Sequence, residues 1–553
     1  MLVNSLFLDF LKEQGLYIAK DGSTRDVICL EFNYGTRSYQ DEVSHLHKNA
    51  QKFSNDYKKA KVQNDKYLME KSARNRERTN ELIQEAYKNK NLYIKRSKEE
   101  VRKLCYVNGI DVKYETHNKS GKLVKSEIIH YKMLYRSTGK AKKGTCTFIR
   151  KEMYNAAHEF LYMGIKLPEH HAKIVEVSAY APLISSGIVG RVQIHPENIL
   201  ILEDVDRFFC RDVVSIETDE NRHCVAKWID DYKLKNEMFD GQALIDTSIF
   251  PEWASGYVLL RHHFTKMAAF HANIQLFFRD WCEQNGWDYN TRTVKDCWGN
   301  DHYLKDIEVI TTTNAVKWMK MDINYDYWCE WVHKNDCMFG VVKFSHPSKL
   351  GRYQKMSYQI VNSLDINTME EVCRDTVDYI QKLKDDDSVF QDYLRKNSNF
   401  ANDYEVLLAL CNWNPDFVKC SYYRERKKRI ISNYLLTIKS GEILQNGDNL
   451  TIVGSPYAML IYGATGNPDD CDLDDTFSVE DGTIQCYTLR FEDGEYLAGF
   501  RSPFNGRFNM DHLHNVYDER FSKYFDFSPQ IIAVNMNGTD MQDRNNGLTF
   551  GPV

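Results

Sequence analysis

The sequence predicts a folded protein of the α+β class, and three observations support this prediction. The chain has 553 residues, 42% of them hydrophobic and 27% charged, which is typical of a folded chain rather than a disordered one. A long helical periodicity stands near the beginning of the chain. Short β-branched and aromatic runs gather in two later centres, around residues 231–321 and 430–553.

The composition excludes several classes of protein. The formal net charge is −6, so the chain has no bulk positive charge that would coat nucleic acid, and any such site must come from local patches. No run of about eighteen apolar residues predicts a spanning helix, and the first residues lack the pattern of a signal peptide. The 14 Cys form no C-x-x-C pair, which favours a reducing compartment. We therefore expect a cytoplasmic protein without membrane segments.

An N-terminal helical arm is predicted over residues 1–110. Apolar residues follow a three-four spacing that indicates a helical seam. The segment 41–103 carries 17 basic and 10 acidic residues, so one or two long helices with a basic face are expected. A solvated helical arm and a nucleic-acid-guiding arm both fit this pattern. The seam comprises Val43, Leu46, Ala50, Phe53, Tyr57 and Ala60.

Four further domains are expected along the chain. Residues 111–230 read as a β-rich domain, with strands at 174–180 and 213–218 and one helix near 150–163. Residues 231–345 mix short strands with a helix around 263–281. Residues 346–428 form a helical connector, with helices over 366–412. Residues 429–553 return to strands, at 430–438, 483–489 and 531–535.

Two segments place single lysines among apolar neighbours. In the first, the turn Asp240-Gly241 leads into a strand, and Arg261 and Lys266 follow. In the second, a strand over 307–313 ends in hydroxyl and amide residues and is followed by Lys317. Lysines so placed are costly to bury unless an anion meets them. Polyphosphate is the anion that these segments favour, although the lysines could also reach solvent from a strand edge.

Common catalytic and metal motifs are missing. The sequence contains no P-loop, no G-x-G-x-x-G, no H-E-x-x-H and no G-x-S-x-G. His512 and His514 would share one strand face, but no carboxylate cluster completes a metal site there. The acidic run 469–475 would place Asp470, Asp472 and Asp474 on one face if it were extended, although a solvated surface loop is the simpler explanation.

The order of the lysine segments resembles a known family, the two-barrel RNA polymerases. These comprise the RNA-dependent RNA polymerases of eukaryotic RNA silencing and their single-chain bacterial and phage relatives. Asp240-Gly241, Arg261, Lys266 and Lys317 match that family's elements in order and approximate spacing. The resemblance implies two double-psi β-barrels, the second of them incomplete, with an N-terminal helical arm and helical insertions.

Further elements of the resemblance lie on either side. Arg501-Ser-Pro-Phe-Asn505 resembles the family's R-x-P element, after which the resemblance implies a helix near 511–517 and a barrel strand at 531–535. The segment 135–144, with Lys140, Lys142 and Lys143, resembles the family's basic pre-barrel segment. A second basic run at 424–429 would face a nucleic-acid backbone, or both runs could be solvated loops.

One departure from the family bears directly on activity. The family carries D-x-D-x-D, whose carboxylates hold catalytic magnesium, where this chain has Thr549, Gly551 and Val553 after Gly547. Because two-metal catalysis needs those carboxylates, no metal-binding residue is assigned and the chain as written is expected to be inactive in nucleotide addition. A truncated or frame-shifted product, or one half of a split enzyme completed by a second chain, is the expectation that follows.

The sequence thus leads to a template-directed RNA polymerase of the two-barrel type, a nucleotidyltransferase that would use Mg²⁺ in an intact form. Lys266 and Lys317 would contact phosphates, and Arg261 and Arg501 would position substrate or product strand. Asp240, Gly241 and Asn505 would line the barrels, and the partners would be a nucleic-acid template and nucleoside triphosphates. A non-catalytic nucleic-acid-binding protein on the same fold, and an unrelated phage or bacterial structural protein, remain as alternatives.

Overall fold

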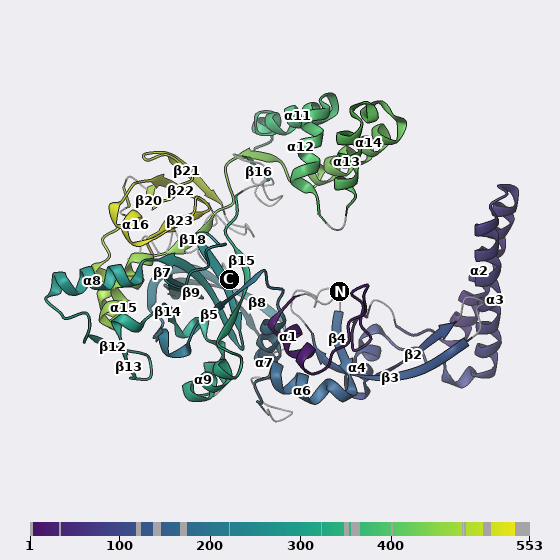
Figure 1. The fold of residues 1–553 in the computed structure, drawn as a ribbon, viewed down its shortest axis with the longest axis horizontal. Helices are drawn as coiled ribbons and strands as arrows, with labels where there is room; N and C mark the ends of the chain where they lie inside the picture. Colours follow the sequence, from purple (N-terminus) through teal and green to yellow (C-terminus); the bar gives the residue numbers. More distant parts are fainter. Residues whose placement is uncertain are drawn as a thin grey trace. The chain divides into compact units, whose positions relative to one another are not determined.

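The computed structural model describes most of the chain and divides it into two compact units, Met1–Gly187 and Ile188–Val553 (Figure 1). The boundary between the units lies inside the range 111–230, where the sequence predicted one β-rich domain. The five domain ranges expected from the sequence stay predictions. The described residues are 4–32, 35–117, 123–136, 145–165, 174–220, 222–321, 323–347, 353–355, 365–399, 402–477, 479–480, 483–500 and 510–536.

The first unit contains the predicted helical arm. Helices α2 and α3 lie side by side as a long hairpin (Figure 1). The side chains of Ser38 and Asp65 cap their N-termini by accepting from backbone N–H groups of the first turn. Leu46 and Ala60 of the predicted seam are buried, so the three-four spacing is confirmed as the packing face of the hairpin. The bounds are α2 (Tyr39–Val62), α3 (Lys66–Lys88) and α4 (Lys98–Asn108).

An antiparallel four-stranded sheet forms the rest of this unit, in the order β1-β4-β3-β2. Its core surrounds the fully buried rings of Tyr131 and Phe148. The helix predicted near 150–163 is confirmed as α6. The bounds are α1 (Leu6–Glu13), β1 (Val27–Glu31), β2 (Ile110–His117), β3 (Leu123–Tyr135), β4 (Thr145–Arg150), α6 (Lys151–Leu161), α7 (Ile174–Tyr180) and the 3₁₀ turn η2 (Ala181–Ser185).

A seven-stranded mixed sheet, here called the first sheet, opens the second unit in the order β5-β15-β10-β11-β9-β14-β6. Its central strands are buried almost throughout, which explains their continuous apolar runs. The bounds are β5 (Gly190–Gln193), β6 (Ile199–Leu202), β9 (Gln242–Asp246), β10 (Tyr257–His262), β11 (Thr265–Ala272), α8 (Ile274–Asn285), β14 (Val309–Thr312), α9 (Tyr325–Lys334) and β15 (Met338–Phe344).

The second sheet repeats the topology of the first. It runs β18-β23-β20-β22-β21, and β19 pairs with β20 outside that path. In chain order, its five main strands stand across the sheet as first, fifth, second, fourth and third. The strands β6, β9, β10, β11 and β14 stand in the same order in the first sheet. The bounds are β18 (Thr451–Gly454), α15 (Pro456–Thr465), β19 (Val479–Glu480), β20 (Thr483–Tyr487), β21 (Tyr496–Phe500), β22 (Met510–Asn515), α16 (Glu519–Tyr524) and β23 (Ile531–Val534).

Strand directions agree as well. From the first strand outward, the four pairings are parallel, antiparallel, parallel and antiparallel in the first sheet. The second sheet has the same sequence of directions. A helix follows the fourth strand in both, α8 in the first sheet and α16 in the second. The two sheets are therefore two copies of one topological plan.

One hydrophobic core joins the two sheets. It includes Leu244 and Phe270 of the first sheet together with Val453 and Ile531 of the second. The equivalent helices α8 and α16 meet in this core, where the rings of Phe277 and Tyr524 lie edge to face at 5.1 Å. Burying both sheets against each other removes their apolar faces from water, which favours one cooperative body.

A helical subdomain and three two-stranded ribbons of the second unit lie outside the two sheets. The predicted helices over 366–412 are confirmed and pack with α14 around a core of their own. The remaining strands form two-stranded ribbons. The bounds are α11 (Met369–Asp385), α12 (Asp387–Asn397), α13 (Tyr404–Trp413), α14 (Ser421–Lys439), β7 (Asp206–Thr218), β8 (Cys224–Glu237), β12 (Thr293–Lys295), β13 (Asp301–Tyr303), β16 (Tyr353–Lys355) and β17 (Leu444–Asn446).

The structure corrects four predicted elements. Residues 174–180 and 430–438, expected as strands, are helical in α7 and α14. The helix expected over 263–281 begins only at Ile274, because residues 265–272 form strand β11. Residues 511–515, expected in a helix, belong to strand β22. The strands expected at 213–218, 483–489 and 531–535 are confirmed in β7, β20 and β23.

No helix in the described ranges combines the length and the apolarity that a bilayer-spanning segment requires.

Candidate functional site

The predicted turn Asp240-Gly241 opens strand β9 of the first sheet. The N–H of Gln242 donates to the carbonyl of Phe239 at 3.0 Å and closes the turn. Gly241 has φ 65°, in the left-handed region where a residue without Cβ is unstrained. Its carbonyl accepts from the N–H of Ala268 at 2.9 Å, which ties the turn to strand β11.

Strands β10 and β11 place Arg261 directly opposite Lys266 in an antiparallel register. Phe264 makes the tight turn between the strands with φ 49°, and its carbonyl accepts from the N–H of Lys317 at 2.8 Å. A backbone bridge between Thr265 and Val316 lies beside this bond. The second lysine segment is thereby fastened to the turn that precedes Lys266.

The structure thus brings four of the predicted residues together at one end of the first sheet. Burial lowers the pKa of Lys266, and the nearby cations Arg261 and Lys317 lower it further, whereas Asp240 acts in the opposite direction. Burial likewise lowers the pKa of Lys317, again opposed by Asp240. Arg261 is 7% exposed, and burial lowers its pKa to about 10. An anion would stabilise these three half-buried or buried cations, in addition to the carboxylates of Asp240, Glu237 and Asp204 that already act on Lys317.

Three residues that the sequence did not assign border this cation cluster. The Nζ of Lys317 donates to Oδ1 of Asn314, and the amide nitrogen of Asn314 donates to Glu237. The backbone N–H of Asn314 donates to Oδ1 of Asp204 at 3.1 Å. Burial and the neighbouring carboxylates of Asp204 and Asp240 raise the pKa of Glu237. An amide three residues before a lysine was the only sequence signal for this arrangement.

The acidic run 469–475 does not form a row of metal ligands. Residues 468–473 form a 3₁₀ helix, in which alternate side chains do not share a face. Asp470 accepts from Asn467, Asp472 pairs with Arg207 at 2.5 Å, and Asp474 is buried and accepts from Thr476. The run is therefore not extended, as a shared metal-binding face would require, and each of the three carboxylates already has protein partners.

The predicted basic run of helix α14 is partly engaged within its own helical subdomain. Arg426 pairs with Asp403, and Lys427 pairs with Asp387 at 2.7 Å. These pairs reduce the charge that the run presents to a nucleic-acid backbone. Lys140, Lys142 and Lys143, Arg501 and Asn505, and the residues after Gly547 all lie outside the described residues.

Several histidines of the two sheets serve packing. His262 and His263 are 0% and 1% exposed, and burial lowers the pKa of His262 to about 3. His514 stacks on Tyr496 with ring centroids 4.4 Å apart. These contacts stabilise the sheets and add no ligand to the cation cluster.

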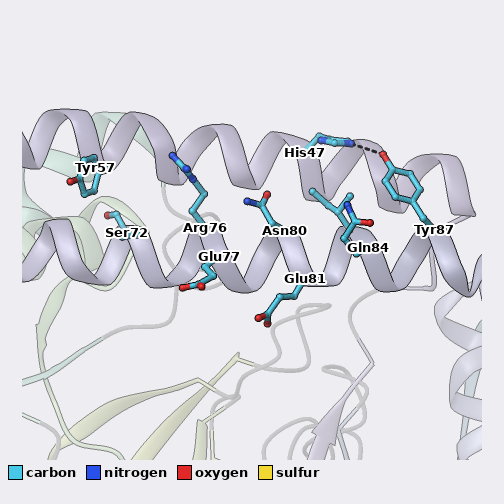
Figure 2. A pocket seen from close by; sticks show the side chains of 11 residues that line it. His47, Tyr57, Ser72, Arg76, Glu77, Asn80, Glu81, Gln84 and Tyr87 are labelled. Carbon is cyan, nitrogen blue, oxygen red and sulfur yellow. Dashed lines mark hydrogen bonds between the residues drawn. The ribbon is translucent and has the colours of Figure 1, made fainter. Parts of the chain in front are cut away.

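The helical hairpin of the first unit carries a polar groove of about 1050 Å³ between α2 and α3. Figure 2 shows its lining side chains, among them Arg76 and Glu77, with His47 hydrogen-bonded to Tyr87 at 3.1 Å. Charges of both signs line the groove, so it shows no preference for an anion.

A scan against protein-family models finds no match to this chain, and a search of curated proteins finds no similar sequence.

Proposed function

We propose that the second unit is the phosphate-binding centre of a template-directed RNA polymerase of the two-barrel type. The observation that carries this proposal is the convergence of Lys266 and Lys317 on Arg261 at one end of the first sheet. Each Lys pKa is lowered chiefly by burial, so burial destabilises the charged forms and a bound anion would offset that cost. A triphosphate or a nucleic-acid phosphate supplies that charge, and lysine meets it as a point charge.

The repeated topology supports the same proposal. A two-barrel polymerase needs two related β-domains side by side, and the two sheets share strand order, strand directions and a helix after the fourth strand. The sequence adds a matching detail, because Asp-Gly stands before the second strand in both: Asp240-Gly241 and Asp481-Gly482. Double-psi closure of each sheet is part of the proposal.

In this proposal the cations bind and orient phosphates and offset charge that develops as the α-phosphate is attacked. Arg261, held by its register opposite Lys266, positions the same phosphates. Magnesium would activate the attacking 3′-hydroxyl and neutralise the leaving pyrophosphate. Asp470, Asp472 and Asp474 do not fit that role, because Arg207, Thr476 and Asn467 already engage them. We therefore assign no magnesium ligand.

Because Asp470, Asp472 and Asp474 are already bonded within the protein, a second candidate function is favoured. In it, the protein binds nucleic acid and does not catalyse nucleotide addition. Both functions require the cation cluster to bind phosphate, and they differ in whether nucleotides are incorporated. A template-primer assay with Mg²⁺ separates them: incorporation supports the polymerase, and salt-sensitive binding alone supports the binding protein.

The test of the cluster is single-stranded RNA binding, followed by fluorescence anisotropy at several salt concentrations. Lys266→Ala and Lys317→Ala should each weaken binding by about 10-fold or more, since a hydrogen bond to a charged group contributes about 1.5–3 kcal/mol. Each should also lower the salt slope by about 0.7, one phosphate contact. Lys343→Ala is the matched control, an exposed lysine on strand β15 of the same sheet. Equal affinities for all four proteins would reject the proposal.

A further inference from the structure

A group of metal-ligating side chains lies beside the edge of the first sheet that strands β5 and β15 form. His195, His333 and Cys337 each offer one donor atom, and these atoms all lie within 4.8 Å of one another. His195 follows strand β5, His333 stands in the last turn of helix α9, and Cys337 directly precedes strand β15. Two segments far apart in the sequence, one with His195 and one with His333 and Cys337, therefore converge on one point.

The backbone holds the two segments in place. Strands β5 and β15 pair antiparallel with Met338 opposite Gln193, and the N–H of Ile194 donates to the carbonyl of Cys337 at 2.9 Å. The N–H of Cys337 in turn donates to the carbonyl of Val332 at 3.0 Å, which closes the end of helix α9. Asp336 and Cys337 both adopt φ 54°. This uncommon backbone turns the thiol back toward the helix that carries His333.

The donor separations are compatible with a tetrahedral centre. The Sγ of Cys337 lies 3.3 Å from Nδ1 of His333. Tetrahedral zinc with ordinary bond lengths separates a sulfur from a nitrogen ligand by roughly 3.6 Å and two nitrogen ligands by roughly 3.4 Å. Small side-chain rotations would bring the three donors to those separations, and a three-ligand site leaves one position open.

A carboxylate orients one of the imidazoles. Oε1 of Glu197 lies 2.5 Å from Nε2 of His333, so this nitrogen carries the proton and Nδ1 presents its lone pair toward Cys337. Burial raises the pKa of Glu197, but the hydrogen bonds that it accepts and the nearby imidazoles of His333 and His195 together leave that pKa below its ordinary value. A carboxylate behind a ligating histidine is the usual outer partner in protein zinc sites.

Access and charge also suit a cation. Cys337 is buried, whereas His195 and His333 are exposed, so solvent reaches one side of the group. Burial raises the pKa of the Cys337 thiol, and the carboxylates of Glu197 and Asp336 raise it further. The negative charge of the same two carboxylates favours a bound cation.

We propose that His195, His333 and Cys337 bind a zinc-class divalent ion, with Glu197 positioning His333. Mixed nitrogen and thiolate donors select such borderline-soft ions over Mg²⁺ or Ca²⁺. Binding converts the Cys337 thiol to a metal thiolate and releases one proton to solvent, so affinity rises with pH. The ion would clamp the end of α9 to the edge strands β5 and β15. This proposal is independent of the function proposed for the cation cluster.

The experiment uses the full chain, stripped with a chelator and titrated with Zn²⁺ against a chromophoric competitor. One equivalent of zinc should bind, and Co²⁺ should give a thiolate-to-metal charge-transfer band in the near ultraviolet. Cys337→Ser should abolish the band, and His195→Ala should abolish competitor-resistant binding. Glu197→Gln should keep the band and weaken affinity by about 10–100-fold.

Cys329→Ser is the matched control, because Cys329 lies on the same helix α9 but outside the group. It should retain full zinc stoichiometry and the cobalt band. Zinc uptake by the wild type no greater than that of Cys337→Ser would overturn the proposal, as would a cobalt complex without a thiolate band. Retention of the band in Cys337→Ser with loss in Cys329→Ser would move the site elsewhere and contradict the assignment.

Discussion

The two sheets of the second unit share one topology but differ in the residues at equivalent places. In the first sheet, the fourth strand carries Lys266, and the chain after the fifth strand carries Asn314 and Lys317. After the fifth strand of the second sheet come Asn535, whose Oδ1 accepts from Ser455, and Met536. After the fifth strand, one copy therefore carries a half-buried cation, and the other carries the neutral residues Asn535 and Met536.

This difference shows how a duplicated fold separates stability from chemistry. The second sheet satisfies its strand ends internally, as where the hydroxyl of Ser455 accepts from the N–H of Met536 at 2.6 Å. The first sheet retains half-buried lysines whose charged state burial disfavours. A protein can tolerate the unfavourable burial of charged lysines when a rigid, well-packed neighbouring sheet supports the site.

The largest expected effect concerns the core that joins the sheets. Phe277 of helix α8 is 1% exposed and contacts Tyr457 of α15 and Tyr524 of α16. Phe277→Ala should lower the free energy of unfolding by about 3–5 kcal/mol, because it leaves a cavity between the two copies. Denaturant unfolding followed by tryptophan fluorescence measures this loss. The exposed Phe208 of strand β7 provides the control, and Phe208→Ala should change stability by less than about 0.5 kcal/mol.

If the sheets were independent, Phe277→Ala would split the transition and leave one part at the wild-type midpoint. A single transition shifted as a whole supports the common core.

A second prediction concerns the polar link between the sheets. The side chain of Gln242 donates to the carbonyl of Gly454 at 3.0 Å and accepts from its N–H at 3.1 Å, and both ends are buried. Gln242→Leu should therefore cost about 2–4 kcal/mol of stability, since two backbone groups lose their buried partner. Thermal unfolding tests this, with the exposed Gln381→Leu on α11 as control. If Gln242→Leu lost no more stability than Gln381→Leu, the hydrogen bonds between Gln242 and Gly454 would not contribute to stability.

A third, somewhat smaller effect depends on pH. Burial raises the pKa of Asp474 to about 6 from an ordinary value of 3.8. The folded state therefore holds this proton more tightly than the unfolded state, and stability is lost as pH rises from about 4 to about 6. Asp474→Asn should remove that loss and gain about 3 kcal/mol relative to the wild type between pH 4 and pH 7, at 1.36 kcal/mol per pH unit.

The neighbouring Asp475→Asn is the control for this titration, because Asp475 is exposed and pairs with Arg520. It should show no such gain over the same range. A pH profile of Asp474→Asn parallel to that of the wild type would contradict a raised pKa at this position.

The smallest expected effect is the pH dependence of phosphate binding. Burial lowers the pKa of Lys266 and Lys317 below 10.5, so their charge is lost at a lower pH than in an exposed lysine. Affinity for ATP should therefore begin to fall below pH 10.5, at a lower pH than that at which an exposed lysine loses its charge. The double variant Lys266→Arg/Lys317→Arg should bind with a flatter profile, because arginine stays charged. Parallel profiles would show that neither lysine titrates in this range.

The sequence was sufficient for elements whose pattern is local. The seam from Val43 to Ala60 predicted the helical hairpin, because packing at three-four spacing leaves a direct trace. It failed at 430–438, where β-branched residues favoured a strand. In α14 the buried Ile430, Ile431 and Tyr434 follow helical spacing and pack into the core of the helical subdomain, so tertiary contacts outweigh β-propensity.

The cation cluster was predictable in part, because residue type and local setting mark some of its members in the sequence. Asp240, Arg261, Lys266 and Lys317 were selected by residue type and setting, and the fold brings them together. Asn314, Asp204 and Glu237 join them only through the pairing of β14 with β6 and the return of the ribbon β7–β8. Pairing between strands more than a hundred residues apart leaves no local pattern. The repeated Asp-Gly before β9 and β20 was a sequence trace of the duplication that only the topology explains.

The most direct measurement of the central claim is calorimetric titration of the full chain with ATP, with and without Mg²⁺. Lys266→Ala/Lys317→Ala should bind ATP at least about 100-fold more weakly than the wild type, since two charge-assisted hydrogen bonds are lost. Lys343→Ala should bind as the wild type does, and circular dichroism should show the same fold in all three. Equal ATP affinity in the double variant and the wild type would contradict a phosphate-binding centre in the first sheet.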